Sequence, residues 1–444
     1  MNDSISHFTT TVTAAVTATA PASATIDIPS DTPPKKAARY VRPVSPLERY
    51  SLVLNEAYRY HVDGIVEGSG TVSREQLQQA VDRAAAANPA IRVRLRGWLQ
   101  YSRWVDSGIA PQVRLLPTSE WDGGSEQNAP FLLERLQPMR GGPVADVLIV
   151  PGRDGKTRLV FRTLHAAIDG RGFLHWVAEV CRAMRGEPLG GSNSALIDID
   201  IQQQHADKVA PEPPAAPALC IPVLAPSVGG RAPLGYVWRR LVIDNSVSQL
   251  LPKTAVFLAQ WARRREPGDV GFTVPVDYRG LRTQEMGLGN LTGYVRLTVP
   301  EDATPRSLML QFGHSLRAYA DCRQIPGIRL LLKLPVWYML RKGRPNVDKA
   351  LYTVTPSVPS GGIVSMGNVS GDTYSFPGFD ARMIYGIPGA VGKLNVVFLN
   401  YPDFTVISFA APAAYNHEGQ LDELIAAYSR HFSKQSPANT ERSA

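Results

Sequence analysis

A predicted β-hairpin that runs directly into an amphipathic helix, over residues 145–185, constrains the fold most strongly. Two apolar, β-prone runs at 145–150 and 157–164 flank the turn-forming sequence Gly-Arg-Asp-Gly at 152–155. After the second run, apolar residues recur at helical spacing over about 172–185. The pattern predicts a mixed α/β fold in which a strand-to-helix junction follows residue 164.

His165 lies in this junction and is the best candidate for a reactive group. A junction loop can present a side chain to a cleft while the strand and the helix hold it still. Four residues on, Asp169 can pair with a cation or hold the loop, and Gly170 permits a turn too tight for a residue with a Cβ atom. The amides that open the helix can stabilise negative charge. The H-x-x-x-D-G pattern therefore predicts a catalytic junction.

The rest of the chain alternates predicted strands and helices in both halves, without a sequence repeat. A proline-rich stretch between residues 202 and 233 separates the halves. Helices are predicted at 74–87, 247–263, 305–323 and 421–432. Strands are predicted at 91–95, 237–243, 270–276, 294–299 and 361–369, and a second hairpin at 393–399 and 404–409. Residues 46–60 are predicted to form either a strand or a short helix. The predicted domains are a disordered extension (1–40), a first lobe (41–205), a proline-rich connection (206–233), a second lobe (234–436) and a tail (437–444).

Composition indicates a globular chain without a membrane span. Of its 444 residues, 44% are hydrophobic and 19% charged, and the most apolar stretch, 328–340, is interrupted by Arg329, Lys333 and Pro335. We expect this stretch to form a buried or channel-lining helix pair. The N-terminal residues lack the basic start and apolar core of a signal peptide, which predicts a cytoplasmic protein.

Three widely spaced cysteines, Cys181, Cys220 and Cys322, argue against a disulfide framework or a zinc ribbon and fit a reducing compartment. His165 and Asp169 have no further metal ligands at recognisable spacing, so we expect no metal.

The net charge of +8 raises the possibility of a nucleic-acid partner. The basic residues are dispersed, however, and only 263–265 forms a tight run. A basic surface equally suits the phosphates of coenzyme A, an acidic carrier protein or plain solvation. We therefore expect no nucleic-acid partner.

These motifs together resemble the condensation-type, HxxxDG acyltransferase superfamily, which includes chloramphenicol acetyltransferase, nonribosomal peptide condensation enzymes and polyketide-associated acyltransferases. The matching segments are an opening pattern at 77–92, the signature at 165–170, and a second-half motif at 274–279 followed by Gly289-Asn290. Leu164 replaces the first histidine of the longer HHxxxDG form. The resemblance implies an α/β fold of two chloramphenicol-acetyltransferase-like lobes, arranged as a V-shaped pseudo-dimer with a tunnel between them.

The resemblance also implies roles for individual residues. His165 is the catalytic residue, Asp169 is mainly structural and pairs with Arg279, and the Gly170 amide is a donor to the oxyanion. Ser365, in a Ser-Met-Gly-Asn sequence, is a weaker candidate for contacting the tetrahedral intermediate.

The implied activity is transfer of an acyl group from a thioester to a hydroxyl or amine, forming an ester or an amide in bacterial specialised-metabolite biosynthesis. No bound cofactor is expected; acyl-CoA or a phosphopantetheine thioester is the co-substrate. The expected partners are a small-molecule acceptor and, in trans, an acyl or peptidyl carrier protein, with the chain itself a monomer. The alternative is a non-catalytic, condensation-like scaffold that binds a carrier protein.

Overall fold

The computed structural model describes residues 39–211, 220–226, 235–244, 247–342, 359–389 and 392–433. Nearly all of the predicted disordered extension, much of the proline-rich connection and the C-terminal tail lie outside these residues.

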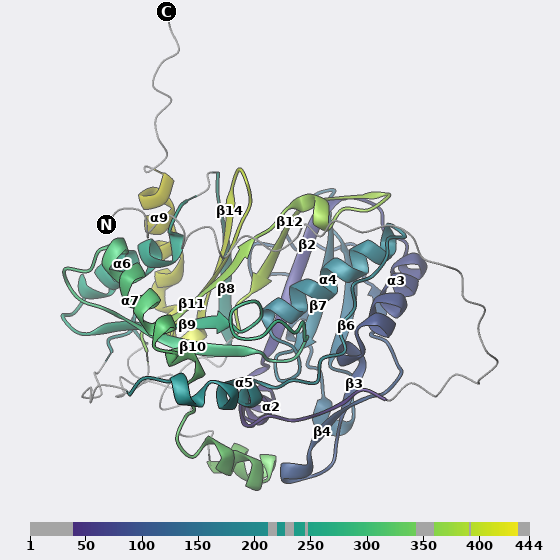
Figure 1. Cartoon of the computed structure of the whole chain (residues 1–444). Helices are drawn as coiled ribbons and strands as arrows, with labels where there is room; N and C mark the ends of the chain where they lie inside the picture. Colours follow the sequence, from purple (N-terminus) through teal and green to yellow (C-terminus); the bar gives the residue numbers. More distant parts are fainter. Residues whose placement is uncertain are drawn as a thin grey trace, which may run out of the picture. The chain divides into compact units, whose positions relative to one another are not determined.

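A five-stranded sheet forms the centre of the first half of the chain (Figure 1). Its strands, in spatial order, are β12 (Phe379–Ile387), β2 (His61–Gly70), β7 (Thr157–Leu164), β6 (Ala145–Pro151) and β5 (Val113–Leu115). The predicted hairpin is confirmed, because β6 and β7 pair antiparallel from Ala145 opposite Thr163 to Pro151 opposite Thr157. The strand β12 comes from the second half of the chain and pairs antiparallel with β2, so the two halves share this sheet.

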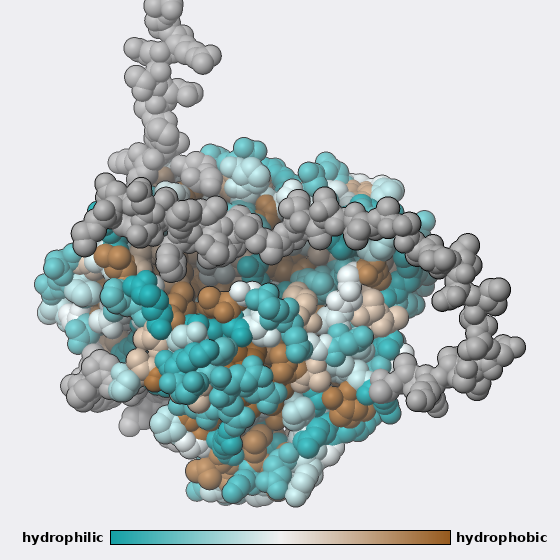
Figure 2. All heavy atoms as spheres, viewed as in Figure 1, coloured by the Kyte–Doolittle hydropathy of each residue, from teal (hydrophilic) through white to brown (hydrophobic). Residues whose placement is uncertain are grey.

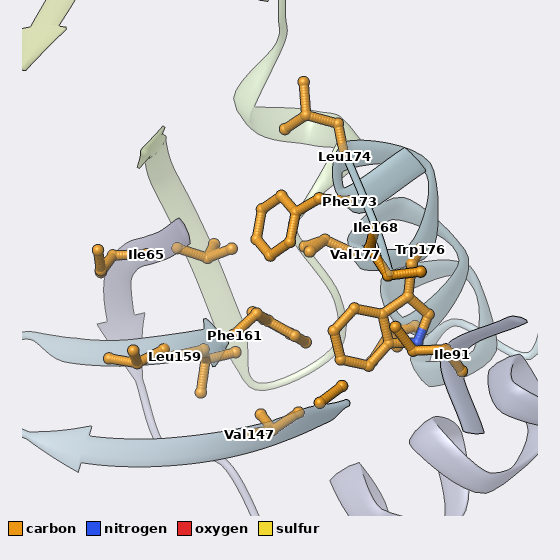
Figure 3. Packing of buried hydrophobic residues seen from close by; sticks show 14 of the residues in the cluster. Ile65, Ile91, Val147, Leu159, Phe161, Ile168, Phe173, Leu174, Trp176 and Val177 are labelled. Carbon is orange, nitrogen blue, oxygen red and sulfur yellow. The ribbon is translucent and has the colours of Figure 1, made fainter. Parts of the chain in front are cut away.

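The predicted helix after the hairpin is α4 (Gly170–Met184), and it packs beside α3 (Arg74–Ala87). Its buried stripe includes Phe173, Trp176 and Val177, which point toward the sheet in Figure 3. The rings of Trp176 and Phe161 of β7 meet edge to face, with centroids 5.4 Å apart. This packing fixes α4, and therefore its first residues, on the strand that leads to His165.

A short sheet and a helix precede the main sheet in the chain. The short sheet has the order β1 (Val41–Pro43), β4 (Arg103–Asp106) and β3 (Val93–Arg96). Residues 46–60, predicted as a strand or a short helix, contain α2 (Pro46–Tyr58), which Ser45 and Glu48 start with a reciprocal capping box. The strand predicted at 91–95 starts later, because a 3₁₀ turn occupies Pro89–Arg92.

A six-stranded sheet forms the centre of the second half and has its own hydrophobic core. Its strands, in spatial order, are β10 (Thr292–Val299), β9 (Val270–Asp277), β11 (Gly361–Asn368), β13 (Asn395–Asn400), β14 (Thr405–Pro412) and β8 (Tyr236–Ile243), and its helices are α6 (Leu250–Arg263), α7 (Pro305–Arg317) and α9 (Gln420–Ser433). The second predicted hairpin is confirmed. The helix predicted at 305–323 is too long, because α7 ends at Arg317.

The apolar stretch at 328–340 does form two helical segments, at 328–333 and from residue 336, but they are not buried as predicted. It begins with the 3₁₀ helix Ile328–Lys333, and the side chains of Leu330 and Trp337 are each 60% exposed. Among the described residues, no helix is both long and apolar enough to cross a bilayer.

Candidate active site

His165 follows β7 directly and is held by both halves of the chain. Its backbone amide donates to the carbonyl of Tyr60 (3.2 Å), and its own carbonyl accepts from Nδ2 of Asn290 (2.9 Å). The imidazole stacks on the Tyr60 ring, with centroids 4.5 Å apart and planes 10° apart. These contacts fix both the position and the plane of the imidazole.

The imidazole is kept neutral near neutral pH. Burial lowers the pKa of His165, and the weaker opposing effects of its own carbonyl, the Asp169 charge and Asn290 do not restore the ordinary value. Within the described part of the chain, Nδ1 is buried and makes no hydrogen bond to another residue. A fixed, neutral imidazole is suited to accept a proton from a hydroxyl or an amine.

Asp169 is saturated with hydrogen bonds and is 3% exposed. It caps α4 by accepting from the Gly172 amide (2.8 Å), and it accepts two bonds from the Arg279 guanidinium (3.0 and 3.1 Å). The Leu291 amide and the Thr292 hydroxyl donate to the same carboxylate (2.9 and 3.0 Å). Because five donors occupy its lone pairs, Asp169 is arranged to hold structure rather than to exchange protons.

Arg279 joins the end of β9 to the start of α4. Besides Asp169, its guanidinium donates to Asp277 (2.7 Å) and to the carbonyls of Gly287 and Gly289 (2.8 Å each). Burial opposes the charge of Arg279, but Asp169 and Asp277 outweigh burial and raise its pKa. The Asp169–Arg279 pair is therefore a buried, charged link between the two halves.

Gly170 is the first residue of α4, and its φ is not positive. The predicted reason for this glycine, a turn too tight for a Cβ atom, is therefore wrong. A Cβ here would lie 2.8 Å from the terminal carbon of Met366 in β11, so the glycine instead admits a side chain from the second sheet beside the helix start.

Gly172 has a stricter steric requirement than Gly170. A Cβ at this position would lie 2.2 Å from the carbonyl oxygen of Leu288 and 2.7 Å from its Cα atom. Backbone cannot rotate away as a flexible side chain can. The start of α4 therefore contacts the backbone of the second half directly.

We expect Gly172→Ala to destabilise the folded chain by about 1–3 kcal/mol, because overpacking forces the two backbones apart. Gly313→Ala is a matched control, since Gly313 is also helical and the nearest atom to an added Cβ is 3.6 Å away. Thermal unfolding of both variants checks the prediction. Equal melting temperatures for the two variants would contradict it.

Ser365 lies in β11 and is exposed. In the described chain it makes no hydrogen bond with His165, Asp169 or Gly170. Its neighbour Met366 contacts Gly170, and successive side chains of a strand point to opposite faces. The structure thus brings His165, Asp169, Gly170 and Arg279 together around the start of α4, and Ser365 does not join the hydrogen bonds of Asp169 and Arg279.

A cavity of about 590 Å³ lies beside the start of α4. Both halves line it, with Arg171, Leu174 and His175 from α4 and Arg279, Met286 and Tyr374 from the second half; His165 is not a lining residue. Burial lowers the pKa of His175, and its Nε2 is buried without a hydrogen bond among the described residues. The same residues contain no group of three or more His, Cys, Asp or Glu side chains suited to a metal ion.

Several residues that support the site were not assigned these roles from sequence: Tyr60, Asn290, Glu48 and Arg42. Arg42 and Glu48 form a buried ion pair (2.6 Å), Arg42 donates to the Ala167 carbonyl (2.8 Å), and Nδ2 of Asn290 is 3.4 Å from Glu48. The Ser-Pro-Leu-Glu sequence at 45–48 has the pattern of a capping box and indicates α2, but no local signal indicates the stacking of Tyr60.

Comparisons with known proteins identify the fold. No family model and no curated protein sequence matches the chain. Solved structures do match: polyketide synthase associated protein 5 from Mycobacterium tuberculosis shares 14% identity over 89% of this chain and 98% of that one, with a TM-score of 0.57.

Two condensation domains match equally well. A variant of the starter condensation domain of rhizomide synthetase RzmA, in complex with C8-CoA, has a TM-score of 0.58 and 14% identity, covering 89% of this chain and 94% of that one. The first condensation domain of the calcium-dependent antibiotic synthetase has a TM-score of 0.57 and 14% identity, covering 90% and 96%. The chain therefore has the condensation-type fold, with two chloramphenicol-acetyltransferase-like lobes.

Proposed function

We propose that this chain is an acyltransferase that moves an acyl group from a thioester to a hydroxyl or amine acceptor. The observation that carries the proposal is the neutral imidazole of His165, which is fixed by Tyr60 and Asn290 where the two halves meet. The Asp169–Arg279 link holds the adjacent helix start and leaves the imidazole as the group able to take a proton.

In the proposed reaction, His165 accepts the proton of the acceptor hydroxyl or amine as that group attacks the thioester carbonyl. The tetrahedral oxyanion lies near the start of α4, where the Gly170 amide and the positive end of the helix dipole stabilise it. The intermediate then expels the thiolate, which takes this proton from the imidazolium and leaves the imidazole neutral again. The products are an ester or an amide and a free thiol, and no acyl-enzyme forms.

The structural neighbours support a thioester donor. The rhizomide starter domain was crystallised with C8-CoA, and the other neighbours come from synthetases or a polyketide-associated protein. By analogy we propose acyl-CoA, or an acyl chain on a carrier protein acting in trans, as the donor in natural-product biosynthesis. Contacts at His165 provide no positive support for the non-catalytic scaffold.

The activity is tested by incubating the full chain with acyl-CoAs and carrier-bound acyl thioesters, together with mixed alcohol and amine acceptors. We expect an acylated acceptor, detected by mass, and an equal amount of released thiol. Carrier-protein binding without any transfer across the panel would favour the scaffold instead.

The pH dependence of kcat/KM follows from the direction of the His165 pKa shift. A protonated imidazole cannot accept a proton, and burial lowers the pKa of His165 from its ordinary value of 6.5. We therefore expect the pH at which kcat/KM falls to half of its maximum to lie below 6.5. Initial rates measured across the pH range with a non-titrating alcohol acceptor check this, and a half-maximal rate above pH 7 would be inconsistent with the site.

A further inference from the structure

Two neighbouring segments expose a group of large apolar side chains, here called the apolar platform. Its members are Trp98, Tyr101, Ile325, Leu330, Trp337 and Tyr338, and each is at least 38% exposed. Trp98 precedes the 3₁₀ turn η2 (Leu99–Tyr101), and Tyr101 ends it. Leu330 lies in η7 (Ile328–Lys333), and the other three flank it in the sequence. Figure 2 shows brown atoms at the lower end of the view, where Figure 1 places the green η7 segment.

The platform is fastened to the fold. The buried guanidinium of Arg49 in α2 donates to the carbonyl of Leu334 (2.6 and 3.1 Å) and to the carbonyl of Leu99 (3.2 Å), so one side chain ties both segments together. Beneath η7, Val336 and Met339 pack on Val53 of α2 in a small core of their own. The segment thus has a packed inner face and an apolar outer face.

The charged residues of the segment around η7 all have one sign. From residue 323 to residue 342 the sequence holds five cationic side chains and no Asp or Glu. Arg329, Lys333, Arg341 and Lys342 are exposed, and none of them makes an ion pair within the described residues. Arg96 and Arg103 add charge beside η2.

We propose that the apolar platform binds the surface of an anionic lipid bilayer. Leucine and isoleucine side chains insert at the boundary between head groups and acyl chains, tryptophan and tyrosine favour the same depth, and flanking lysine and arginine contact anionic head groups. A protein partner is less suited, because a run of cations without any acid matches a uniformly negative surface better. The chain lies on the bilayer in this arrangement, and the proposal does not depend on the acyl-transfer reaction.

Vesicle flotation of the full chain tests the proposal. We expect the protein to float with vesicles of phosphatidylcholine and phosphatidylglycerol and to remain below with phosphatidylcholine alone. The triple variant Ile325→Ser, Leu330→Ser, Trp337→Ser should lower the partition coefficient about ten-fold or more. The double variant Ile109→Ser, Leu133→Ser removes equally exposed apolar groups elsewhere and should float like the unsubstituted chain.

Tryptophan fluorescence gives a second, independent readout. Trp98 and Trp337 are exposed, whereas Trp104, Trp121, Trp176 and Trp238 are buried. Anionic vesicles should shift the emission to shorter wavelength, and the Trp98→Phe, Trp337→Phe variant should lose this shift. The proposal is overturned if the unsubstituted chain does not float, or if the triple variant floats equally well. It is also overturned if the platform instead mediates a concentration-dependent dimer without lipid binding.

Discussion

Replacing His165 with alanine is expected to lower kcat/KM for acyl transfer by about 10²–10⁴-fold, the range typical of a lost general base. The imidazole is the neutral, fixed acceptor at the junction, and the hydrogen-bonded carboxylate of Asp169 is not placed to replace it. The fold should persist, because the backbone bonds of residue 165 to Tyr60 and Asn290 do not use the side chain. Product formation under steady-state conditions measures the effect.

His175→Gln is the matched control for this variant. His175 is a second histidine with a lowered pKa, and it lines the adjacent cavity rather than the junction. We expect it to retain activity within about ten-fold, because it does not take the reacting proton. If His175→Gln lowered kcat/KM as much as His165→Ala, the base would be His175 in the cavity and not His165 in the junction.

Arg279→Ala is expected to cost about 3–5 kcal/mol of unfolding free energy, because it leaves the buried Asp169 charge without its counter-ion. Asp169 would keep bonds from Gly172, Leu291 and Thr292 but lose both guanidinium bonds. The carbonyls of Gly287 and Gly289 would lose their donor as well. Denaturant unfolding followed by circular dichroism measures the loss.

Arg153→Ala is the control for this prediction, since the pair of Arg153 with Glu120 is exposed on both sides. Surface pairs of this kind contribute about 0–1 kcal/mol. The double variant Asp169→Asn, Arg279→Gln should recover part of the stability, because it removes both charges together. If Arg279→Ala and Arg153→Ala lowered the free energy of unfolding equally, the Asp169–Arg279 pair would not stabilise the contact between the two halves.

Local sequence patterns predict most strands and helices, since the hairpin turns and the period of the apolar residues act within a few positions. The capping box at Ser45 and Glu48 is a local signal of the same kind and marks the start of α2. Composition alone mispredicted the burial of residues 328–340, because an apolar stretch does not reveal which of its side chains pack against a partner. The pairing of β12 with β2 joins residues about three hundred positions apart, and no local pattern contains it.

The residues of the candidate site also fall into two groups, those that a local sequence pattern predicts and those that depend on tertiary structure. H-x-x-x-D-G is local and indicated His165 and Asp169, while Arg279 came from the resemblance to the superfamily. The stacking of Tyr60 and the bond from Asn290 arise where β2 and the β9–β10 connection meet the junction, so they depend on tertiary structure. Gly170 was identified for the wrong reason, because Met366 approaches it from another sheet.

The acceptor dependence of thiol release tests most directly whether His165 is the base of an acyl transfer that forms no acyl-enzyme. The unsubstituted chain should release thiol only when an acceptor is present, at the rate at which acylated product forms, and His165→Ala should release almost none. Thiol release without an acceptor would indicate hydrolysis instead of transfer. Equal rates for the two proteins would show that His165 is not the base.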